Sequence, residues 1–368
     1  MRGVVLGEAA YSPAVVRPLS RWLRLAGSHE PFRLPLVGPE GGRVLFVQSG
    51  EITDLLFAAP LITGLHRTYP RCRISALVAE DASELIRHHP HVHDMLLFSP
   101  NRMGLASPSF YKLARKLRKH AYDMVIHMGE APAPAYQLLG YLSGAPVRVG
   151  PQRDGAYPYV NCELRWSAER SGYEGRRLGE VGGLMGVQLP ADWRSAVLTD
   201  QDMRFARQLV HFRKPRRDQI LIGVDPGRGK SQTKVMDRTL AYLVGAVYQQ
   251  YRSKVIVLAT PNEDETATRF EQSLKCERID LPRHNIKDVV ALLSQCDLFL
   301  SGNTNLFHFA VAFGVPTIGL FTDRDDRRWV PPAQPHLVTV HGRRGAKLSL
   351  ADFMAQVEKL LSLPPRTL

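Results

Sequence analysis

Short, nearly continuous apolar runs recur along the chain, and helix-length stretches with apolar residues three and four positions apart separate them. The runs occupy residues 44–47, 74–78, 95–98, 124–127, 220–224, 255–258, 298–300 and 317–321. Such runs suit strands buried on both faces, as in parallel sheets. Stretches such as 55–69 and 239–251 fit the helices that connect parallel strands. The alternation therefore predicts an α/β protein.

The alternation occurs twice, and 368 residues are enough for two domains with sizeable cores. We expect two Rossmann-like domains with parallel sheets facing a central cleft. The expected divisions are an N-terminal extension at 1–42, a first domain at 43–200, a basic linker at 201–217, a second domain at 218–350 and a C-terminal helix at 351–368. Ligands of open α/β sheets bind beyond the carboxyl ends of strands, so the loops there are candidate sites.

The chain is basic, with 48 lysines and arginines against 35 acidic residues and a formal charge of +13. This surplus favours anionic partners. The cysteines are scattered without a C-x-x-C pair, which fits a reducing cytosol rather than a disulfide scaffold. No apolar run approaches the roughly 20 residues that cross a bilayer. We therefore expect a soluble, cytoplasmic protein.

A polar segment, residues 48–54 (QSGEITD), follows the first predicted strand and leads into a helix. Asp54 falls in the first turn of that helix, where the helix dipole keeps a carboxylate ionised. Asp54 is therefore a candidate general base that accepts a proton from a substrate hydroxyl. The same position also suits an ordinary helix N-cap, and Glu51 is a rival carboxylate.

The second half opens with a strand and a glycine-containing loop, residues 225–234 (DPGRGKSQTK). A P-loop ending at Lys230 would need glycine at position 224, which is valine, so this is not a P-loop. Small residues such as Gly227 let the backbone approach a ligand, and Lys230 and Lys234 can meet anionic oxygens. A solvated turn with surface lysines is the alternative.

A polar run, residues 301–305 (SGNTN), stands between a strand and an apolar helix. The N-terminus of such a helix offers free amide donors and is a ready phosphate site. Thr304 can add a hydroxyl donor, and His308 can hydrogen-bond a ligand from the same helix. Alternatively, Asn303 and Thr304 only cap the helix and His308 is a packing residue.

Two further segments are rich in one residue type. Residues 88–93 (HHPHVH) raise the possibility of a zinc or nickel site, but Pro90 breaks regular geometry and the run holds no acidic or cysteine ligand. We expect a surface loop there and no metal site.

Residues 112–120 (KLARKLRKH) contain no acidic residue and favour an anionic acceptor or acidic membrane surface, with a solvated face as the alternative. No nucleic-acid motif is present.

Together these motifs resemble glycosyltransferase family 9, the heptosyltransferases of bacterial lipopolysaccharide core assembly. The resemblance spans about residues 43–361 and rests on four stretches. They are the strand VLFV with Thr53, Asp54, Leu55, Leu56, Pro60, Leu65, Tyr69 and Pro70; residues 122–127 with 148–150; residues 225–227 with Lys234; and residues 303–308 with 314–316, Leu320 and Phe321.

The resemblance implies a GT-B fold and an inverting transfer from a nucleotide-diphosphate sugar, usually ADP-heptose, with no metal cofactor. Matched residue by residue, it implies Asp54 as catalytic base and, for donor binding, Gly227, Lys234, Glu263, Asn303, Thr304, Asn305 and His308. The implied partners are the nucleotide sugar and an anionic glycolipid or glycan acceptor, not nucleic acid. Peripheral contact with the cytoplasmic face of the inner membrane is also expected.

The sequence departs from the family pattern at several matched positions. Thr53 replaces a glycine, Asn303 and Asn305 replace an aspartate and a glycine, and Met236 and Asp237 replace a tryptophan and a proline. Two other functions therefore stay open. One is a nucleotide-sugar epimerase of GT-B type, which acts on the donor alone. The other is a non-catalytic protein that binds a sugar nucleotide or a glycan.

Overall fold

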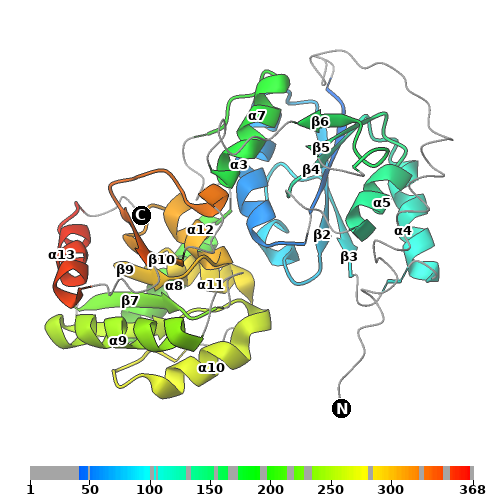
Figure 1. The fold of residues 1–368 in the computed structure, drawn as a ribbon. Helices are drawn as coiled ribbons and strands as arrows, with labels where there is room; N and C mark the ends of the chain where they lie inside the picture. Colours follow the sequence, from blue (N-terminus) through cyan, green and yellow to red (C-terminus); the bar gives the residue numbers. More distant parts are fainter. Residues whose placement is uncertain are drawn as a thin grey trace. The chain divides into compact units, whose positions relative to one another are not determined.

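The computed structural model describes residues 41–48, 50–99, 103–104, 107–129, 134–152, 156–164, 173–190, 197–213, 219–227, 234–280, 285–322, 327–342 and 349–364. The chain divides into two compact units, Met1–Ala191 and Asp192–Leu368. Each unit is an α/β body with its own parallel sheet (Figure 1). The expected N-terminal extension, residues 1–42, lies almost wholly outside the described residues.

A six-stranded sheet forms the centre of the first unit, in the order β3-β2-β1-β4-β5-β6, and all its pairings are parallel. The strands are β1 (Arg43–Val47), β2 (Arg73–Ala79), β3 (Asp94–Phe98), β4 (Met124–His127), β5 (Val147–Pro151) and β6 (Cys162–Leu164). The chain runs outward from β1 to β3 on one side and resumes at β4 on the other. The topological switch point therefore lies between β1 and β4, where open α/β sheets bind ligands.

Helices cover both faces of this first sheet. On one face α3 (Thr53–Thr68) packs against α7 (Arg177–Leu184), and on the other α4 (Pro108–Lys119) packs against α5 (Pro134–Leu142) (Figure 1). Helix α3 is buried from Thr53 to Leu65, because α7 covers the side that the sheet does not. Short 3-10 turns, η1 (Ser83–Leu85) and η2 (Glu174–Arg176), complete the unit.

The second unit has a five-stranded parallel sheet in the order β11-β10-β9-β7-β8. Its strands are β7 (Ile220–Asp225), β8 (Ser253–Val257), β9 (Leu298–Ser301), β10 (Thr317–Thr322) and β11 (Leu337–Gly342). The chain passes from β7 to β8 on one side and from β9 to β11 on the other. The switch point therefore lies between β7 and β9, whose last residues, Asp225 and Ser301, are register partners.

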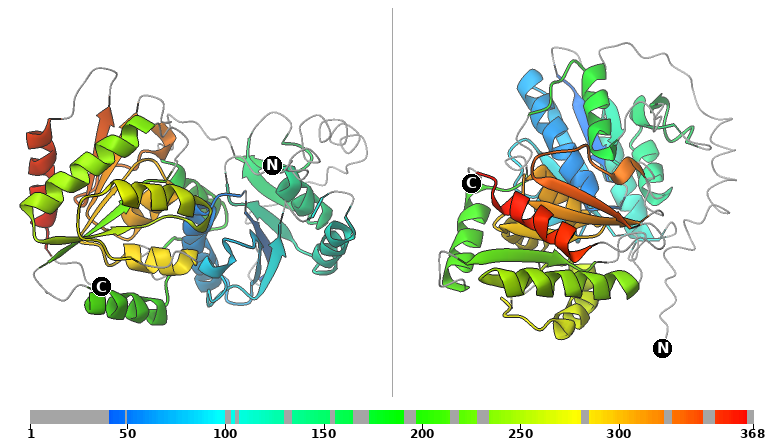
Figure 2. Two further views of the ribbon diagram at one scale, coloured as in Figure 1. Left: turned by 90° about the horizontal axis from the view of Figure 1, so that it is seen from below. Right: turned by 60° about the vertical axis from the view of Figure 1, so that its left-hand side comes forward.

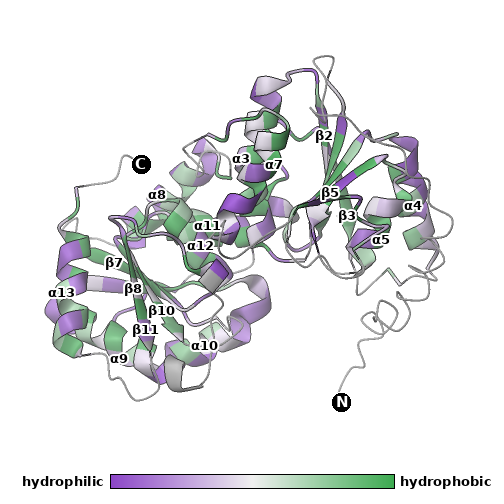
Figure 3. Ribbon diagram, turned by 45° about the horizontal axis from the view of Figure 1, so that its top comes forward, coloured by the Kyte–Doolittle hydropathy of each residue, from purple (hydrophilic) through white to green (hydrophobic). Residues whose placement is uncertain are grey.

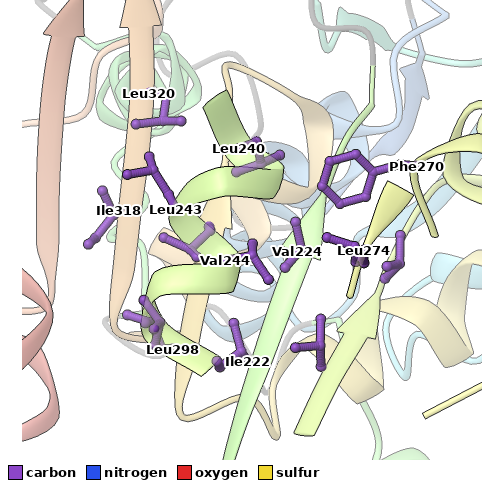
Figure 4. Close-up of a cluster of buried hydrophobic side chains, with 14 of the residues drawn as sticks. Ile222, Val224, Leu240, Leu243, Val244, Phe270, Leu274, Leu298, Ile318 and Leu320 are labelled. Atoms are coloured by element: carbon purple, nitrogen blue, oxygen red, sulfur yellow. The ribbon is translucent and has the colours of Figure 1, made fainter. Parts of the chain in front are cut away.

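Helices also cover both faces of the second sheet (Figure 2). One face carries α9 (Lys234–Gln250), α10 (Asp264–Ser273) and α13 (Leu350–Leu361), and the other carries α8 (Asp200–Arg213), α11 (Ile286–Leu293) and α12 (Asn305–Ala312). The 3-10 turns are η3 (Pro261–Glu263) and η4 (Arg327–Trp329). Under α9, Leu240, Leu243 and Val244 pack on Ile222 and Val224 of β7 (Figure 4). Burial of both sheet faces explains the unbroken apolar runs.

Part of the expected linker is structured. Residues 201–213 lie within α8, which packs on α11 through buried Met203 and Ala206. The boundary expected at residue 200 therefore falls at the start of a helix, whereas the division between the units follows Ala191. The arginines that indicated a linker, Arg204 and Arg207, lie on the exposed face of this helix.

Hydropathy follows the layers of each unit. The strands of the second sheet are largely hydrophobic, while α4 and α13 carry hydrophilic stretches (Figure 3). Among the helices in the described part of the chain, none combines the length and the apolar character needed to cross a membrane.

Candidate functional site

The first candidate site lies where β1 leads into α3, beside the switch point of the first sheet. Asp54 stands in the first turn of α3 and is 5% exposed. Its Oδ2 accepts a hydrogen bond from the backbone N–H of Glu51 at 3.3 Å. Ile52 holds the N-cap position, so Asp54 is not an ordinary N-cap. The carboxylate of Asp54 therefore lies at the positive end of the dipole of α3.

Gln48 anchors the loop that precedes Asp54, a role not predicted from the sequence. Its side-chain Nε2 donates to the carbonyl oxygen of Glu51 at 2.9 Å, and its Oε1 accepts from the backbone N–H of Ala79 at 2.8 Å. One buried amide thus ties the loop after β1 to the end of β2. The rival carboxylate Glu51 is exposed.

A buried ion pair places a guanidinium at the end of β4. The side chains of Arg177 and Glu174 are each 2% exposed, and Arg177 Nε lies 2.5 Å from Glu174 Oε1. Arg177 Nη2 donates to the carbonyl oxygen of Met128, the residue after β4, and buried Nη1 has no hydrogen-bond partner among the described residues. The sequence signal is E-x-x-R, which also describes an ordinary helical surface pair. The position of this guanidinium at the end of β4 could therefore not be predicted from the sequence.

The second candidate site is organised by Asp225, the last residue of β7 and fully buried. Its Oδ1 accepts from the backbone N–H of Gly227 at 2.7 Å, and its Oδ2 accepts from the hydroxyl of Thr304 at 2.5 Å. Burial and then the charge of Glu263 raise the pKa of Asp225 to about 7, against opposing hydrogen bonds from Thr304, Gly227 and Ser301. One carboxylate therefore joins the glycine loop to the start of α12.

Gly227 lies between two carboxylates. A Cβ at this position would lie 2.7 Å from Asp225 Oδ1 and 2.9 Å from each carboxylate oxygen of Glu263, so a side chain there would displace these carboxylates. The hydroxyl of Thr260 donates to Glu263 Oε2 at 2.8 Å and orients it. The structure thus brings together Gly227, Glu263 and Thr304, which the sequence analysis assigned to donor binding.

Thr304 is the N-cap of α12. Its Oγ1 accepts from the backbone N–H of Phe307 at 3.2 Å, while its hydroxyl proton is directed to Asp225. The hydroxyl therefore acts within the protein, and the donors that α12 presents are its first backbone amides. Asn303 and Asn305 flank Thr304 and are half-buried.

His308 lies one turn into α12 and is 2% exposed. Burial lowers its pKa to about 3, so the imidazole is uncharged at neutral pH. Its ring packs against Phe307 and Trp329, with centroids 5.2 and 5.4 Å away. A ligand that reached His308 would meet a neutral ring. Lys234 begins α9, and residues 228–233 before it lie outside the described residues.

The histidine run at 88–93 is a loop with exposed positions, as expected, but His89 within it is buried. His89 is 8% exposed with its Nε2 3.5 Å from the hydroxyl of Thr63, and His93 Nδ1 accepts from the backbone N–H of Ile74 at 3.2 Å. His91 stacks on His66. Packing near Thr63 of α3 thus buries the His89 ring, whereas His88 and His93 are exposed. Across the described ranges, no three His, Cys, Asp or Glu side chains gather as metal ligands.

The basic segment predicted at 112–120 lies largely in α4. Phe110, Leu113 and Leu117 face the core, and the cations lie on the exposed side. These cations are Lys112, Arg115, Lys116, Arg118 and Lys119. Tyr111 among them is 64% exposed. The outer surface of α4 is therefore positively charged along its length.

Comparison with protein-family models assigns most of the chain to a family. The family model for glycosyltransferase family 9 (heptosyltransferase) matches residues 110–352. The lipopolysaccharide core heptosyltransferase OpsX of Haemophilus influenzae is 21% identical over 304 residues, which cover 81% of this chain and 84% of OpsX.

Two solved structures share the fold. A glycosyltransferase family 9 protein from Veillonella parvula aligns with a TM-score of 0.69 at 14% identity, covering 89% of this chain and 99% of that one. Escherichia coli heptosyltransferase WaaC with ADP aligns with a TM-score of 0.62 at 18% identity, covering 86% of this chain and 99% of WaaC. The fold expected from the sequence, two Rossmann-like domains of GT-B type, is confirmed.

Proposed function

The chain belongs to glycosyltransferase family 9, and we propose that it transfers a heptose from ADP-heptose to a lipopolysaccharide-core acceptor with inversion at the anomeric carbon. Family membership makes the protein a glycosyltransferase. OpsX and WaaC are both named heptosyltransferases, and the WaaC structure is one with ADP, which supports this donor and acceptor.

The proposed donor site is the switch point of the second sheet. The observation that carries it is the pair of bonds from Asp225 to Gly227 and Thr304, which hold a glycine loop beside a helix N-terminus. Backbone amides at such a place bind phosphate oxygens. Glu263, oriented by Thr260, is suited to accept hydrogen bonds from ribose hydroxyls.

Asp54 acts as the base in the proposed reaction. It takes the proton from an acceptor hydroxyl while that oxygen attacks the anomeric carbon from the face opposite the diphosphate. The bond from the sugar to the diphosphate breaks, and ADP leaves. Lys234 and the first amides of α12 stabilise the charge that develops on the departing diphosphate.

The base assignment predicts that Asp54→Asn abolishes transfer. Because the amide cannot accept the proton, turnover with ADP-heptose and a truncated lipopolysaccharide core should fall by about 100-fold or more, while donor affinity is unchanged. The matched control is Glu51→Gln, which removes the exposed rival carboxylate three residues earlier and should leave turnover intact. Wild-type turnover in Asp54→Asn would show that Asp54 is not the base.

The proposed role of Lys234 and α12 in charge stabilisation predicts that transfer needs no divalent cation. Turnover in EDTA should equal turnover in magnesium, because the protein itself supplies the positive charge that a metal would supply. A loss of activity in EDTA that magnesium restores would contradict this.

The same assays separate the two alternative functions. An epimerase would convert ADP-heptose without any acceptor, and a binding protein would retain the donor without transferring its sugar. A labelled sugar that appears on the acceptor, with nothing formed from donor alone, supports the transferase.

We also propose that α4 contacts an anionic surface, either the acceptor glycolipid or the membrane that carries it. The charge of its outer side and the exposed ring of Tyr111 support this contact. The apolar side of α4 packs in the core, so the contact is electrostatic rather than an insertion.

A further inference from the structure

A chain of hydrogen bonds at the carboxyl end of the second sheet ends on the buried carboxylate of Asp225. The hydroxyl of Thr304 donates to Asp225 Oδ2 at 2.5 Å. Thr304 Oγ1 lies 3.0 Å from Ser301 Oγ, and either atom can be the donor. Ser301 Oγ also donates to the carbonyl oxygen of Gly302 at 3.1 Å. Every link except the last is a hydroxyl, so the direction of the chain can reverse.

This chain satisfies Asp225 whether its carboxyl is ionised or protonated. In the ionised form, the hydroxyl of Thr304 donates to Asp225. In the protonated form, the carboxyl O–H donates to Thr304 Oγ1, and Thr304 turns its proton to Ser301 Oγ. The second lone pair of Thr304 Oγ1 keeps its bond from Phe307 N–H. Protonation therefore leaves no buried polar group without a partner.

The groups around Asp225 bring its pKa close to neutral pH. Glu263 is its acidic neighbour, across Gly227. Burial and the charge of Glu263 hold the pKa of Asp225 at about 7. On α12 the titratable group is His308, which is uncharged because burial lowers its pKa to about 3. Helix α9, after the glycine loop, begins with Lys234 and carries an aspartate in its first turn.

We propose that donor binding is coupled to the uptake of one proton by Asp225, so that the diphosphate is received beside a neutral carboxyl. The inference rests on the proposed function, in which the diphosphate lies between Gly227 and the start of α12. Asp225 bonds both segments, so a diphosphate there adds negative charge beside its carboxyl and favours protonation. By linkage, protonation of Asp225 favours donor binding to the same extent.

The test is calorimetric titration of the whole protein with ADP-ribose, a nucleotide diphosphate whose phosphates carry no ionisable proton near neutral pH. The Kd should rise about tenfold from pH 6 to pH 8. One linked proton changes the affinity tenfold per pH unit above the pKa of the free protein, and only the interval from pH 7 to pH 8 lies above that pKa. Titrations at pH 8 in two buffers of different ionisation enthalpy should show uptake of close to one proton per ADP-ribose bound.

Asp225→Asn should copy the protonated state, since its Oδ1 can accept from Gly227 N–H and its Nδ2 can donate to Thr304 Oγ1. This variant should bind ADP-ribose at pH 8 as tightly as wild type does at pH 6, without proton uptake. The matched control is Asp297→Asn. Asp297 accepts from the backbone N–H of Leu221, at the opposite end of β7, at 2.7 Å. It should keep the wild-type pH dependence.

Four results would overturn the inference. Wild-type affinity that does not change with pH, or an absence of proton uptake, excludes the coupling. Wild-type pH dependence in Asp225→Asn assigns the proton to another group, and weak binding by this variant at every pH shows that the ionised carboxylate is required. Failure of both ADP-ribose and UDP-glucose to bind at any pH would instead overturn the proposed function, and the inference with it.

Discussion

One buried histidine is expected to make the first unit sensitive to acid. Burial, with a smaller effect from the charge of His91, lowers the pKa of His89 from 6.5 to about 4. The fold favours the neutral ring, so this stabilisation is complete above pH 6.5 and is lost as the pH falls toward 4. Between pH 7 and pH 5 this residue should lower the free energy of unfolding by about 2 kcal/mol.

The measurement is urea unfolding of wild type and His89→Gln at both pH values. The variant should lose less stability than wild type on acidification, by about the amount assigned to His89. The exposed neighbour gives the matched control, because His88→Gln should follow wild type. Equal losses in wild type and His89→Gln would contradict the assignment.

The residues of the candidate site differ in how far the sequence could predict them. Asp54 and Gly227 follow predicted strands closely, so local pattern was enough to select them. The role of Asp225 was not visible, because its bond to Thr304 joins positions 79 residues apart. The same bond uses the hydroxyl of Thr304, which we expected from the sequence to donate to a ligand. A sequence pattern selects residue types, whereas the direction of a hydroxyl proton depends on the partners that the fold supplies.

At the scale of elements, the charged side of α4 should attract anionic bilayers. Replacing Lys112, Arg115 and Lys116 with glutamine should weaken co-sedimentation with phosphatidylglycerol vesicles by about 1 kcal/mol per charge removed. The matched control removes three exposed cations of the second unit, Arg238, Arg252 and Lys275, and should change binding little. If both triple variants lost binding equally, net charge rather than α4 would be responsible.

Strand prediction succeeded for all the interior strands except β5 and for two of the four edge strands, β3 and β8. The runs at 44–47 and 124–127 correspond to β1 and β4, which are buried along their whole apolar length. Three strands were not predicted, β5, β6 and β11, and β6 and β11 are sheet edges. Strand β6 has only three residues, none of them buried. An edge strand has one neighbour, so its sequence need not be continuously apolar.

At the scale of the molecule, each unit has its own sheet and core, so each should fold alone. Residues 192–368 expressed separately should unfold cooperatively and bind ADP-ribose with nearly the affinity of the whole protein, because the proposed donor contacts lie in this unit. Residues 1–191 should fold without binding ADP-ribose. Calorimetry on both fragments checks this. Binding of ADP-ribose by residues 1–191 would show that the nucleotide site lies in the first unit and would contradict the proposal.

The bonds from Asp225 to Gly227 and Thr304 also have a consequence for synthesis. Domains fold as the chain emerges from the ribosome, N-terminal parts first. Gly227 emerges long before Thr304, and until Thr304 arrives the carboxylate has no hydroxyl to complete its set of bonds. The proposed donor site should therefore be among the last features of the enzyme to mature, and a nascent chain stalled before this threonine should carry a finished first unit but lack that site.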